Sequence, residues 1–279
     1  MSEAKSIEEI ILKYSSRGMN ILKDHLPKDY CSIAANEILS WKKGNVVLAT
    51  GFYVAGFAET DGPAGTVVLG RALKKLGYDP VIVTDEYCRN FFEDEDFKVR
   101  YLDLNADSES CWELLKELDP VGMISIERCG KNIEGKYANM RGVDIGEHTA
   151  PVDELFRLAF GEIPTIGIGD GGNEIGMGNL KETISNELSL TPCEVKTDIL
   201  LIASVSNWGA YALAAALSEK TGQDLMTSSE ETEAYIGKTV ELGSVDGVSH
   251  EHKVSVDGND ISIEMEIIDE LIGSMKITA

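Results

Sequence analysis

Four acidic residues stand in glycine-rich or charged surroundings that suit chemistry better than an ordinary surface. They are Glu59, Asp61, Glu127 and Asp170. Carboxylates can accept or donate protons and can bind a divalent cation. Neighbouring glycines allow main-chain amides to approach a ligand closely. These residue types predict acid–base chemistry on a small polar substrate, with cation binding as a further option.

The most distinctive segment is residues 169–178, which holds five glycines in ten residues and cannot form a stable helix interior. Its successive amides can form a nest for a carboxylate or an oxyanion. A purely structural turn is the alternative. The candidate substrate contacts are Gly171, Gly172 and Asn173, and the candidate ligands for Mg²⁺ or Mn²⁺ are Asp170 and Glu174.

Residues 51–65 form a second glycine-containing loop, and long ordered loops are often functional. Pro63 suits the first turn of a following helix, whose free amides could hold an anion. The spacing matches neither GxGxxG nor a P-loop, so no nicotinamide or flavin is indicated. The alternative for Asp61 is a simple helix cap. Beside Glu59 as a catalytic candidate, the candidate substrate contacts are Gly56, Thr60, Asp61 and Gly62.

A charged loop begins at Glu127, directly after an apolar run. This carboxylate can act as a base or pair with the adjacent arginine, and arginine can hold a substrate carboxylate through two parallel hydrogen bonds. His148 is a candidate acid. Cys129 has no neighbouring histidine, so we interpret it as a packing residue. The candidate substrate contacts in this loop are Arg128, Lys131, Asn139 and Arg141.

Two other polar pairs have weaker signals. Ser206 and Asn207 follow the last apolar run, where they could contact a ligand or cap a helix. His250 and His252 share one face of a predicted strand, and solvent exposure is favoured over metal binding for them.

The elements that would position these residues alternate between short apolar runs and helical segments. Runs that are almost continuously apolar are typical of strands buried on both faces. The pattern predicts an α/β fold with a doubly wound, mostly parallel sheet and helices on both faces. Ligands bind at the carboxyl ends of such strands, where the loops above lie. The predicted strands are residues 46–50, 81–84, 99–102, 121–126, 165–168 and 199–203, and the intervening helices are residues 64–76, 111–118, 152–160 and 208–221.

Residues 1–279 are interpreted as a single domain. Residues 1–44 form a helical N-terminal segment, with one helix from residue 7 to about residue 19 and another over 32–41. Residues 45–221 form the α/β core. Residues 222–279 form a C-terminal extension packed on that core, with helices over 229–242 and 261–275.

Composition limits the class of function. The net charge of −23 opposes binding to nucleic-acid phosphates or an anionic membrane. The uncharged run 199–218 changes from strand-like to alanine-rich, which favours a strand and a helix over a membrane span. Five scattered cysteines and no signal peptide lead us to expect reduced thiols in a cytoplasmic protein. Homo-oligomerisation stays open.

Several blocks together resemble the D-glutamate cyclase C-terminal domain family, also called DUF4392. They are the Glu-Thr-Asp-Gly-Pro block at 59–63, Glu127 with Arg128, the segments 139–144 and 149–153, the glycine-rich segment 167–178, and the Val-Asp-Gly motifs at 245–247 and 256–258. The resemblance covers nearly the whole chain. It implies a lyase of amino-acid metabolism that converts D-glutamate to 5-oxo-D-proline with loss of water.

The residues themselves suggest how such a reaction could proceed. Arg128, Arg141 or Lys131 would hold the α-carboxylate, and Glu127 or Asp170 would take the proton of the attacking amine. The charge of the attacked carboxylate would be offset by the glycine amides or by a cation on the acidic residues. Glu59 or His148 would protonate the departing oxygen. Two alternatives remain: a lyase or hydrolase of another small carboxylate or phosphorylated metabolite, and a non-catalytic metabolite-binding protein.

Overall fold

A six-stranded sheet forms the centre of the molecule. The computed structural model describes residues 5–188 and 190–275. The sheet has the order β5-β4-β1-β6-β7-β8, and each neighbouring pair is parallel. This confirms the six strands predicted from the apolar runs. They are β1 (Asn45–Thr50), β4 (Asp79–Thr84), β5 (Lys98–Tyr101), β6 (Gly122–Ile126), β7 (Thr165–Gly169) and β8 (Ile199–Ile202).

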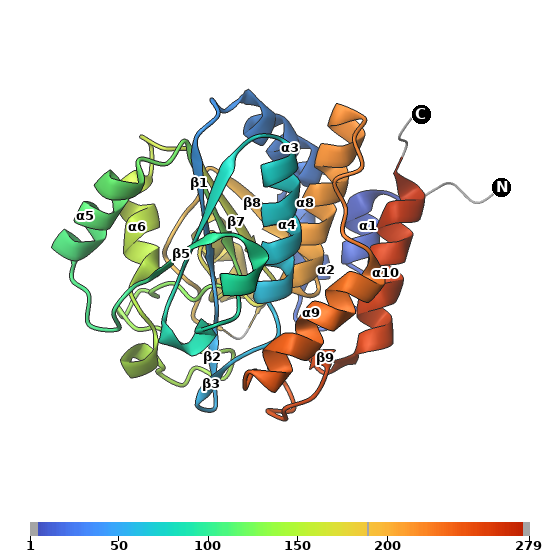
Figure 1. Ribbon diagram of the computed structural model, residues 1–279. Helices are drawn as coiled ribbons and strands as arrows, with labels where there is room; N and C mark the ends of the chain where they lie inside the picture. The colour runs from blue at the N-terminus through green and yellow to red at the C-terminus, as the bar shows by residue number, and fades with distance from the viewer. Residues whose placement is uncertain (1–4, 189, 276–279) are drawn as a thin grey trace.

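Helices cover both faces of the sheet (Figure 1). On one face, α8 (Ser206–Thr221) packs against both α3 (Tyr30–Ser40) and α4 (Pro63–Lys75). On the other face, α5 (Ser108–Leu118) lies beside α6 (Val152–Ala159). The doubly wound α/β fold is therefore confirmed.

The N-terminal segment differs from its prediction as one helix from residue 7 to 19. It forms α1 (Ile7–Ile11) and α2 (Met19–Leu22), and a 3-10 turn, η1 (Lys23–His25), follows. The chain leaves the helical conformation between them because Tyr14 (φ 60°) and Gly18 (φ 85°) adopt left-handed backbone angles. Apolar spacing continues across this break, which is why periodicity alone missed it.

The C-terminal extension forms two helices that add a layer outside α8. They are α9 (Ser229–Glu241) and α10 (Ile261–Ser274). In Figure 1, α10 lies beside α1 and α9, and it packs on α8 as well. Both helices begin where the sequence predicted them, and Ser228 and Asp260 cap their first turns.

Smaller elements surround the sheet. The sequence did not predict the hairpin of β2 (Tyr53–Val54) and β3 (Phe57–Ala58), the hairpin of β9 (Ser255–Val256) and β10 (Asn259–Asp260), the helix α7 (Lys181–Glu187), or the 3-10 turns η2 (Glu86–Cys88), η3 (Glu93–Glu95), η4 (Gly146–His148) and η5 (Met177–Leu180). His250 and His252 lie in a loop and not on a strand face, which corrects that prediction.

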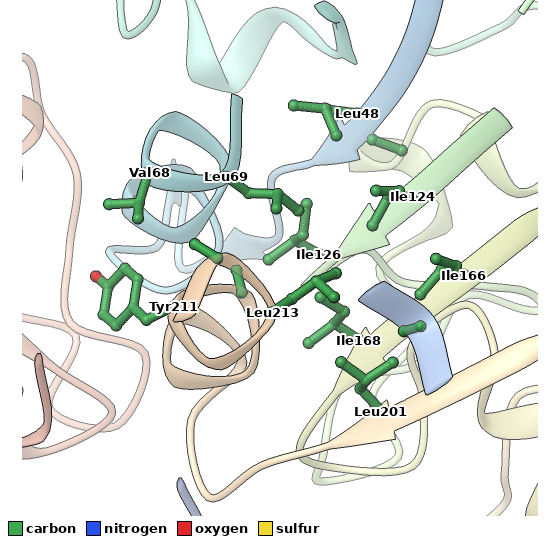
Figure 2. Packing of buried hydrophobic residues seen from close by; sticks show 14 of the residues in the cluster. Leu48, Val68, Leu69, Ile124, Ile126, Ile166, Ile168, Leu201, Tyr211 and Leu213 are labelled. Atoms are coloured by element: carbon green, nitrogen blue, oxygen red, sulfur yellow. The ribbon is translucent and has the colours of Figure 1, made fainter. Parts of the chain in front are cut away.

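The core occupies both faces of the sheet, and a large part of it lies between the sheet and the layer of α4 and α8. Figure 2 shows branched side chains of the strands meeting side chains of these two helices. Fully burying an aliphatic side chain of this size contributes about 1.5–3 kcal/mol relative to exposure. Buried residues labelled in the figure include Leu48, Ile124, Ile126, Ile166, Ile168 and Leu201 from the strands, and Leu69 and Leu213 from the helices.

The contact between α4 and α8 is close because Gly65 has no side chain. A Cβ atom at Gly65 would lie 2.8 Å from the Cβ of Ala210 and 3.0 Å from the Cα of Asn207. The missing methyl lets the two helices approach at their N-terminal ends. The loops that lead into them, after β1 and after β8, are thereby brought together.

The uncharged run 199–218 consists of β8 followed by most of α8. Within residues 5–188 and 190–275, no helix combines the length and apolarity that a bilayer crossing would need. The five cysteines are buried and free, as the interpretation of reduced thiols requires.

Two glycine-to-alanine substitutions test the helix contact against intrinsic helix propensity. Gly65→Ala should destabilise the protein by about 1–3 kcal/mol, since the new methyl overpacks the α4–α8 contact. Gly237→Ala, inside α9, where the new methyl would meet no atom within 4 Å apart from the backbone of its own helix, should stabilise it by about 0.5–1 kcal/mol. Urea unfolding measures both, and equal effects of the two changes would contradict the described packing.

Candidate active site

The candidate site lies where the direction of winding changes. β1 and β6 are neighbours at the centre of the sheet, and later strands are added outward from each. The loops that leave their carboxyl ends therefore diverge and leave a crevice between them. One oxygen atom from each of Asp61, Glu127 and Asp170 lies within 4.8 Å of the other two, and Glu59 lies close enough to interact electrostatically with Asp61. The predicted convergence of these loops is thus present.

Asp61 is fixed by the start of α8. Its carboxylate accepts hydrogen bonds from the amides of Ser206 (2.9 Å) and Asn207 (2.7 Å), the first two residues of that helix. The Asn207 side-chain oxygen in turn accepts hydrogen bonds from the amides of Gly62 (2.9 Å) and Gly65 (2.7 Å) at the start of α4. Asp61, from the loop before α4, therefore caps α8, and Asn207, at the start of α8, caps α4. Asp61 is a cap, as the alternative interpretation held, although it caps α8 and not α4.

Glu127 has a left-handed backbone with φ 45°, which is uncommon for a residue other than glycine. Its Oε2 accepts a hydrogen bond of 2.6 Å from the Ser206 hydroxyl. Gly62 lies against it, and a Cβ there would come within 2.9 Å of the Glu127 Cβ. The turn thus directs the carboxylate away from the strand and into the crevice.

Arg17 and Asp257 complete the cluster, and our sequence reasoning missed both. Arg17 Nη1 lies 2.7 Å from Asp170 Oδ1 and 2.8 Å from Asp257 Oδ2. Asp257 and Gly258 form the two-residue turn of the β9–β10 hairpin, with φ angles of 52° and 76°. The Asp-Gly turn signal was visible in the sequence, whereas no local pattern marks Arg17.

The glycine-rich loop is already occupied by one of its own side chains. The Glu174 carboxylate accepts hydrogen bonds from the amides of Asp170 (3.2 Å), Gly171 (2.6 Å) and Gly172 (2.7 Å). The predicted anion nest exists, but Glu174 fills it. This corrects the expectation that the Gly171 and Gly172 amides bind substrate, while Glu174 as a cation ligand stays a prediction.

Arg128 is also engaged by the protein itself. Its guanidinium donates hydrogen bonds to the carbonyls of Gly51 (2.7 Å) and Ala150 (2.7 Å) and pairs with Asp85 at 2.6 Å. The side chain is 1% exposed, so a substrate carboxylate has no access to it. Lys131 lines a separate hollow beside Arg157 and Lys196. Neither residue is placed to hold the substrate as predicted.

A cavity of about 500 Å³ opens above the cluster. Glu59, Glu127, Asp257 and Arg17 line it, while Asp61 and Asp170 are buried among them. Of the remaining candidates, those that line it are Asn139, Arg141, His148 and Asn173. Its other walls are mainly apolar or aromatic, including Phe52, Tyr53 and Ile145.

His148 is held in the aromatic wall. Its ring stacks on Tyr53 with centroids 4.2 Å apart, and its Nδ1 lies 2.7 Å from the Tyr87 hydroxyl. The second ring nitrogen is thus left for other partners. Asn173 donates to the Ala138 carbonyl at 2.9 Å, while its buried side-chain oxygen has no partner in the described part of the chain.

The other predicted contacts have structural positions. Gly56 is in the turn of the β2–β3 hairpin, where an added Cβ would meet no atom beyond its chain neighbours, and Thr60 donates its hydroxyl to the Ser255 carbonyl at 2.7 Å. Ser206 and Asn207 hold Glu127 and the two helix starts, so they position the site without lining the cavity. Gly62 makes room for the turn at Glu127.

Burial dominates the electrostatics of the cluster. It raises the pKa of Asp170 to about 7, against the lowering effect of Arg17, and the pKa of Asp257 to about 8, with Asp170 adding to the rise. Burial and neighbouring carboxylates also hold the pKa values of Glu59, Asp61 and Glu127 well above their usual ranges. The site therefore keeps protons on carboxyl groups near neutral pH.

The fold and this site define an α/β protein with an acidic, proton-holding cavity at the switch point of a parallel sheet. Residues 7–272 match the family described as D-glutamate cyclase-like, C-terminal, and the chain belongs to that family. One relative is the human protein named D-glutamate cyclase, mitochondrial, which is 37% identical over 182 residues. That match covers 57% of this chain and 29% of the human protein.

Similar solved structures are more distant. An exopolyphosphatase-related protein from Bacteroides fragilis has a TM-score of 0.45 at 10% identity, with 89% of this chain and 57% of that chain covered. A UDP-glucose 4-epimerase from Brucella ovis has a TM-score of 0.29 at 16% identity, with 53% and 49% covered. Neither likeness contributes to the functional argument.

The raised pKa values predict how stability changes with pH. A carboxyl with a raised pKa holds a proton in the folded state that the unfolded chain releases above about pH 4, so stability falls as pH rises from about 4 and levels off above about 7 to 8. The slope is about 1.4 kcal/mol per pH unit for each proton. Urea unfolding between pH 6 and pH 8.5 should show this fall, and Asp257→Asn should flatten it. A free energy of unfolding that increases over this range would contradict the assignment.

Proposed function

We propose that this chain catalyses the intramolecular dehydration of D-glutamate to 5-oxo-D-proline. Membership of the D-glutamate cyclase-like family supports the reaction class, and the match to the human protein supports the substrate. The observation that carries the proposal is the cavity in which buried carboxyl groups hold protons near neutral pH beside a guanidinium. Such a site suits a reaction that must both remove and supply protons.

The reaction has clear requirements. The substrate amine attacks its own γ-carboxyl carbon, a C–N bond forms, a C–O bond breaks, and the expelled oxygen leaves as water. The ammonium group must lose two protons, and the departing carboxylate oxygen must gain two to leave as water. Because the reaction is intramolecular, a cavity that holds the substrate folded supplies much of the rate. A volume of about 500 Å³ is ample for an amino acid of this size.

Glu127 and Glu59 are the cavity carboxyls that fit these roles. Glu127, directed into the cavity by its left-handed turn, would accept a proton of the amine as the ionised member of the cluster, since neighbouring carboxyl groups oppose the ionisation of all its members together. Glu59, whose pKa burial raises well above its usual range, would hold a proton more readily than an ordinary glutamate and would donate it to the departing oxygen. His148 lines the same cavity and is an alternative donor.

A divalent cation is a further component of the proposal. Asp61, Glu127 and Asp170 offer oxygen atoms that fit one ion, and Asp170 Oδ2 is buried without a hydrogen-bond partner in the described residues. Mg²⁺ and Mn²⁺ prefer such carboxylate oxygens. A cation there would offset the charge of the attacked carboxylate. Glu127 would then be a ligand, and His148 would be left to accept the proton.

The function is tested directly by incubating the protein with D-glutamate and with L-glutamate and separating the enantiomers of 5-oxoproline. The proposal predicts 5-oxo-D-proline from the D-enantiomer. Turnover of neither enantiomer, with a different small carboxylate raising the melting temperature, would favour another enzyme or a binding protein on the same fold.

Glu59→Gln tests the acid. It should lower kcat for D-glutamate by about 10²- to 10⁴-fold, since the amide cannot donate the proton in the same way. The melting temperature should stay equal or rise, because a crowded carboxyl is replaced by a neutral group. Glu109→Gln, on the exposed first turn of α5, is the matched control. Native turnover by Glu59→Gln would remove Glu59 from the mechanism.

Cation binding has its own readout in stability. Millimolar MnCl₂ or MgCl₂ should raise the melting temperature at pH 7.5, because a ligand that binds the folded state stabilises it. Asp170→Asn should lose most of this rise, whereas Asp96→Asn, an exposed control, should keep it. An unchanged melting temperature together with turnover that resists chelators would exclude the cation and leave the cyclase proposal standing.

A further inference from the structure

Arg17 occupies an unusual position for a residue of the N-terminal segment. It lies between α1 and α2, far in sequence from the sheet loops, yet it lines the acidic cavity beside Glu59, Glu127 and Asp257. Its side chain is 21% exposed, so a ligand in the cavity can reach it. Arg128, by contrast, is 1% exposed and engaged by the protein.

The guanidinium of Arg17 is only partly used. Nη1 contacts both Asp170 and Asp257, whereas Nε and Nη2 make no hydrogen bond within residues 5–188 and 190–275. Arginine carries five N–H donors in a planar fork that matches a carboxylate. Contacts through Nη1 alone therefore leave Nε–H and an Nη2–H free to bind a second anion.

The cavity also needs a cation to admit an acidic substrate. Glu59, Glu127 and Asp257 line it, and a further carboxylate would be repelled wherever these groups are ionised. Burial alone would lower the pKa of Arg17, but Asp170 and Asp257 raise it above its ordinary value, so the guanidinium stays charged. Arg141 is the other arginine among the lining residues, and it lies on the exposed rim loop.

We propose that Arg17 anchors the substrate through the carboxylate that survives the reaction, the α-carboxylate. This inference rests on the proposed function and names its specificity residue. A permanently charged fork suits a group that stays ionised throughout. The attacked γ-carboxyl must lose an oxygen, and protonated carboxyl groups assist that loss. A guanidinium hydrogen-bonded to both oxygens would oppose it.

The backbone around Arg17 is fixed before any substrate arrives. Gly18 adopts φ 85° and packs so closely on Leu188 that a Cβ would lie 2.3 Å from its side chain. The Ile11 carbonyl accepts a hydrogen bond of 2.9 Å from the Ser204 amide, which ties the end of α1 to the loop after β8. Asp170 and Asp257 then orient the guanidinium. Such an arrangement lowers the entropic cost of holding a ligand.

The experiment measures binding, so that it does not depend on turnover. Isothermal titration calorimetry with 5-oxo-D-proline, which keeps only the α-carboxylate, and with glutarate compares the wild-type protein with Arg17→Met, Arg17→Lys and Arg100→Met. Arg100 lies on the edge strand β5 and pairs with Glu117, and its substitution serves as the matched control. The proposal predicts affinity at least about tenfold weaker for both ligands in Arg17→Met, an intermediate loss in Arg17→Lys, and no change in Arg100→Met.

The outcomes separate the anchor from the function. Unchanged affinity in Arg17→Met or Arg17→Lys, with a lower melting temperature, would show a purely structural counter-ion and overturn the anchor alone. Loss of glutarate binding with native 5-oxo-D-proline binding would overturn the α-carboxylate assignment. Arg17→Lys keeps the charge and serves if Arg17→Met does not fold. Wild-type protein that neither binds these ligands nor converts D-glutamate would overturn the proposed function and the anchor together.

Discussion

The candidate site depends on the burial of several carboxyl groups around one guanidinium, at the carboxyl ends of the central strands of the sheet. Asp170 and Asp257 both contact Arg17, while Asp61 lies close enough to raise the pKa of Glu59, and Glu59 and Asp61 both raise that of Glu127. Burying ionised carboxylates without partners is costly, so such groups retain protons instead. A set of acids that ordinarily ionise near pH 4 thereby becomes a proton reservoir near neutrality.

The fold holds this arrangement through main-chain contacts. Asp61 caps α8 and Asn207 caps α4, so the two helices and the two acid-bearing loops form one unit. Left-handed turns at Glu127 and Asp257 then direct their carboxylates toward the same point. Backbone conformations of this kind cost free energy and persist where the surroundings fix them, which is a common feature of functional sites. Membership of the D-glutamate cyclase-like family agrees with a catalytic use of this geometry.

Much of the architecture could be predicted from the sequence because its signals are local. Continuous apolar runs identified the six strands, and the acidic residues in the loops after β1, β6 and β7 could be expected to meet once the sheet was parallel. The break between α1 and α2 was missed because apolar residues continue through it. Short hairpins such as β2–β3 carry too few residues for periodicity to show.

The partners of the site residues were less predictable, because they depend on tertiary contacts. Arg128 next to Glu127 suggested substrate binding, yet its side chain reaches Asp85 and two carbonyls. Glu174 fills the glycine nest that was expected to hold a ligand. Arg17 comes from a segment more than one hundred residues away from Asp170 in the chain, and no spacing rule connects them. Loop placement predicted where the acidic cavity lies, while the hydrogen-bond partners of its residues could be found only in the folded structure.

The central claim is that carboxyl groups of this cluster stay protonated near neutral pH. Infrared difference spectroscopy of the carboxyl C=O stretch, recorded as the pH is raised from 6 to 9, observes that state directly. The account predicts a protonated-carboxyl band at pH 6 that loses intensity as the pH rises through about 7 to 8, with a smaller loss in Asp257→Asn. A spectrum in which every carboxyl is already ionised at pH 6 would contradict it.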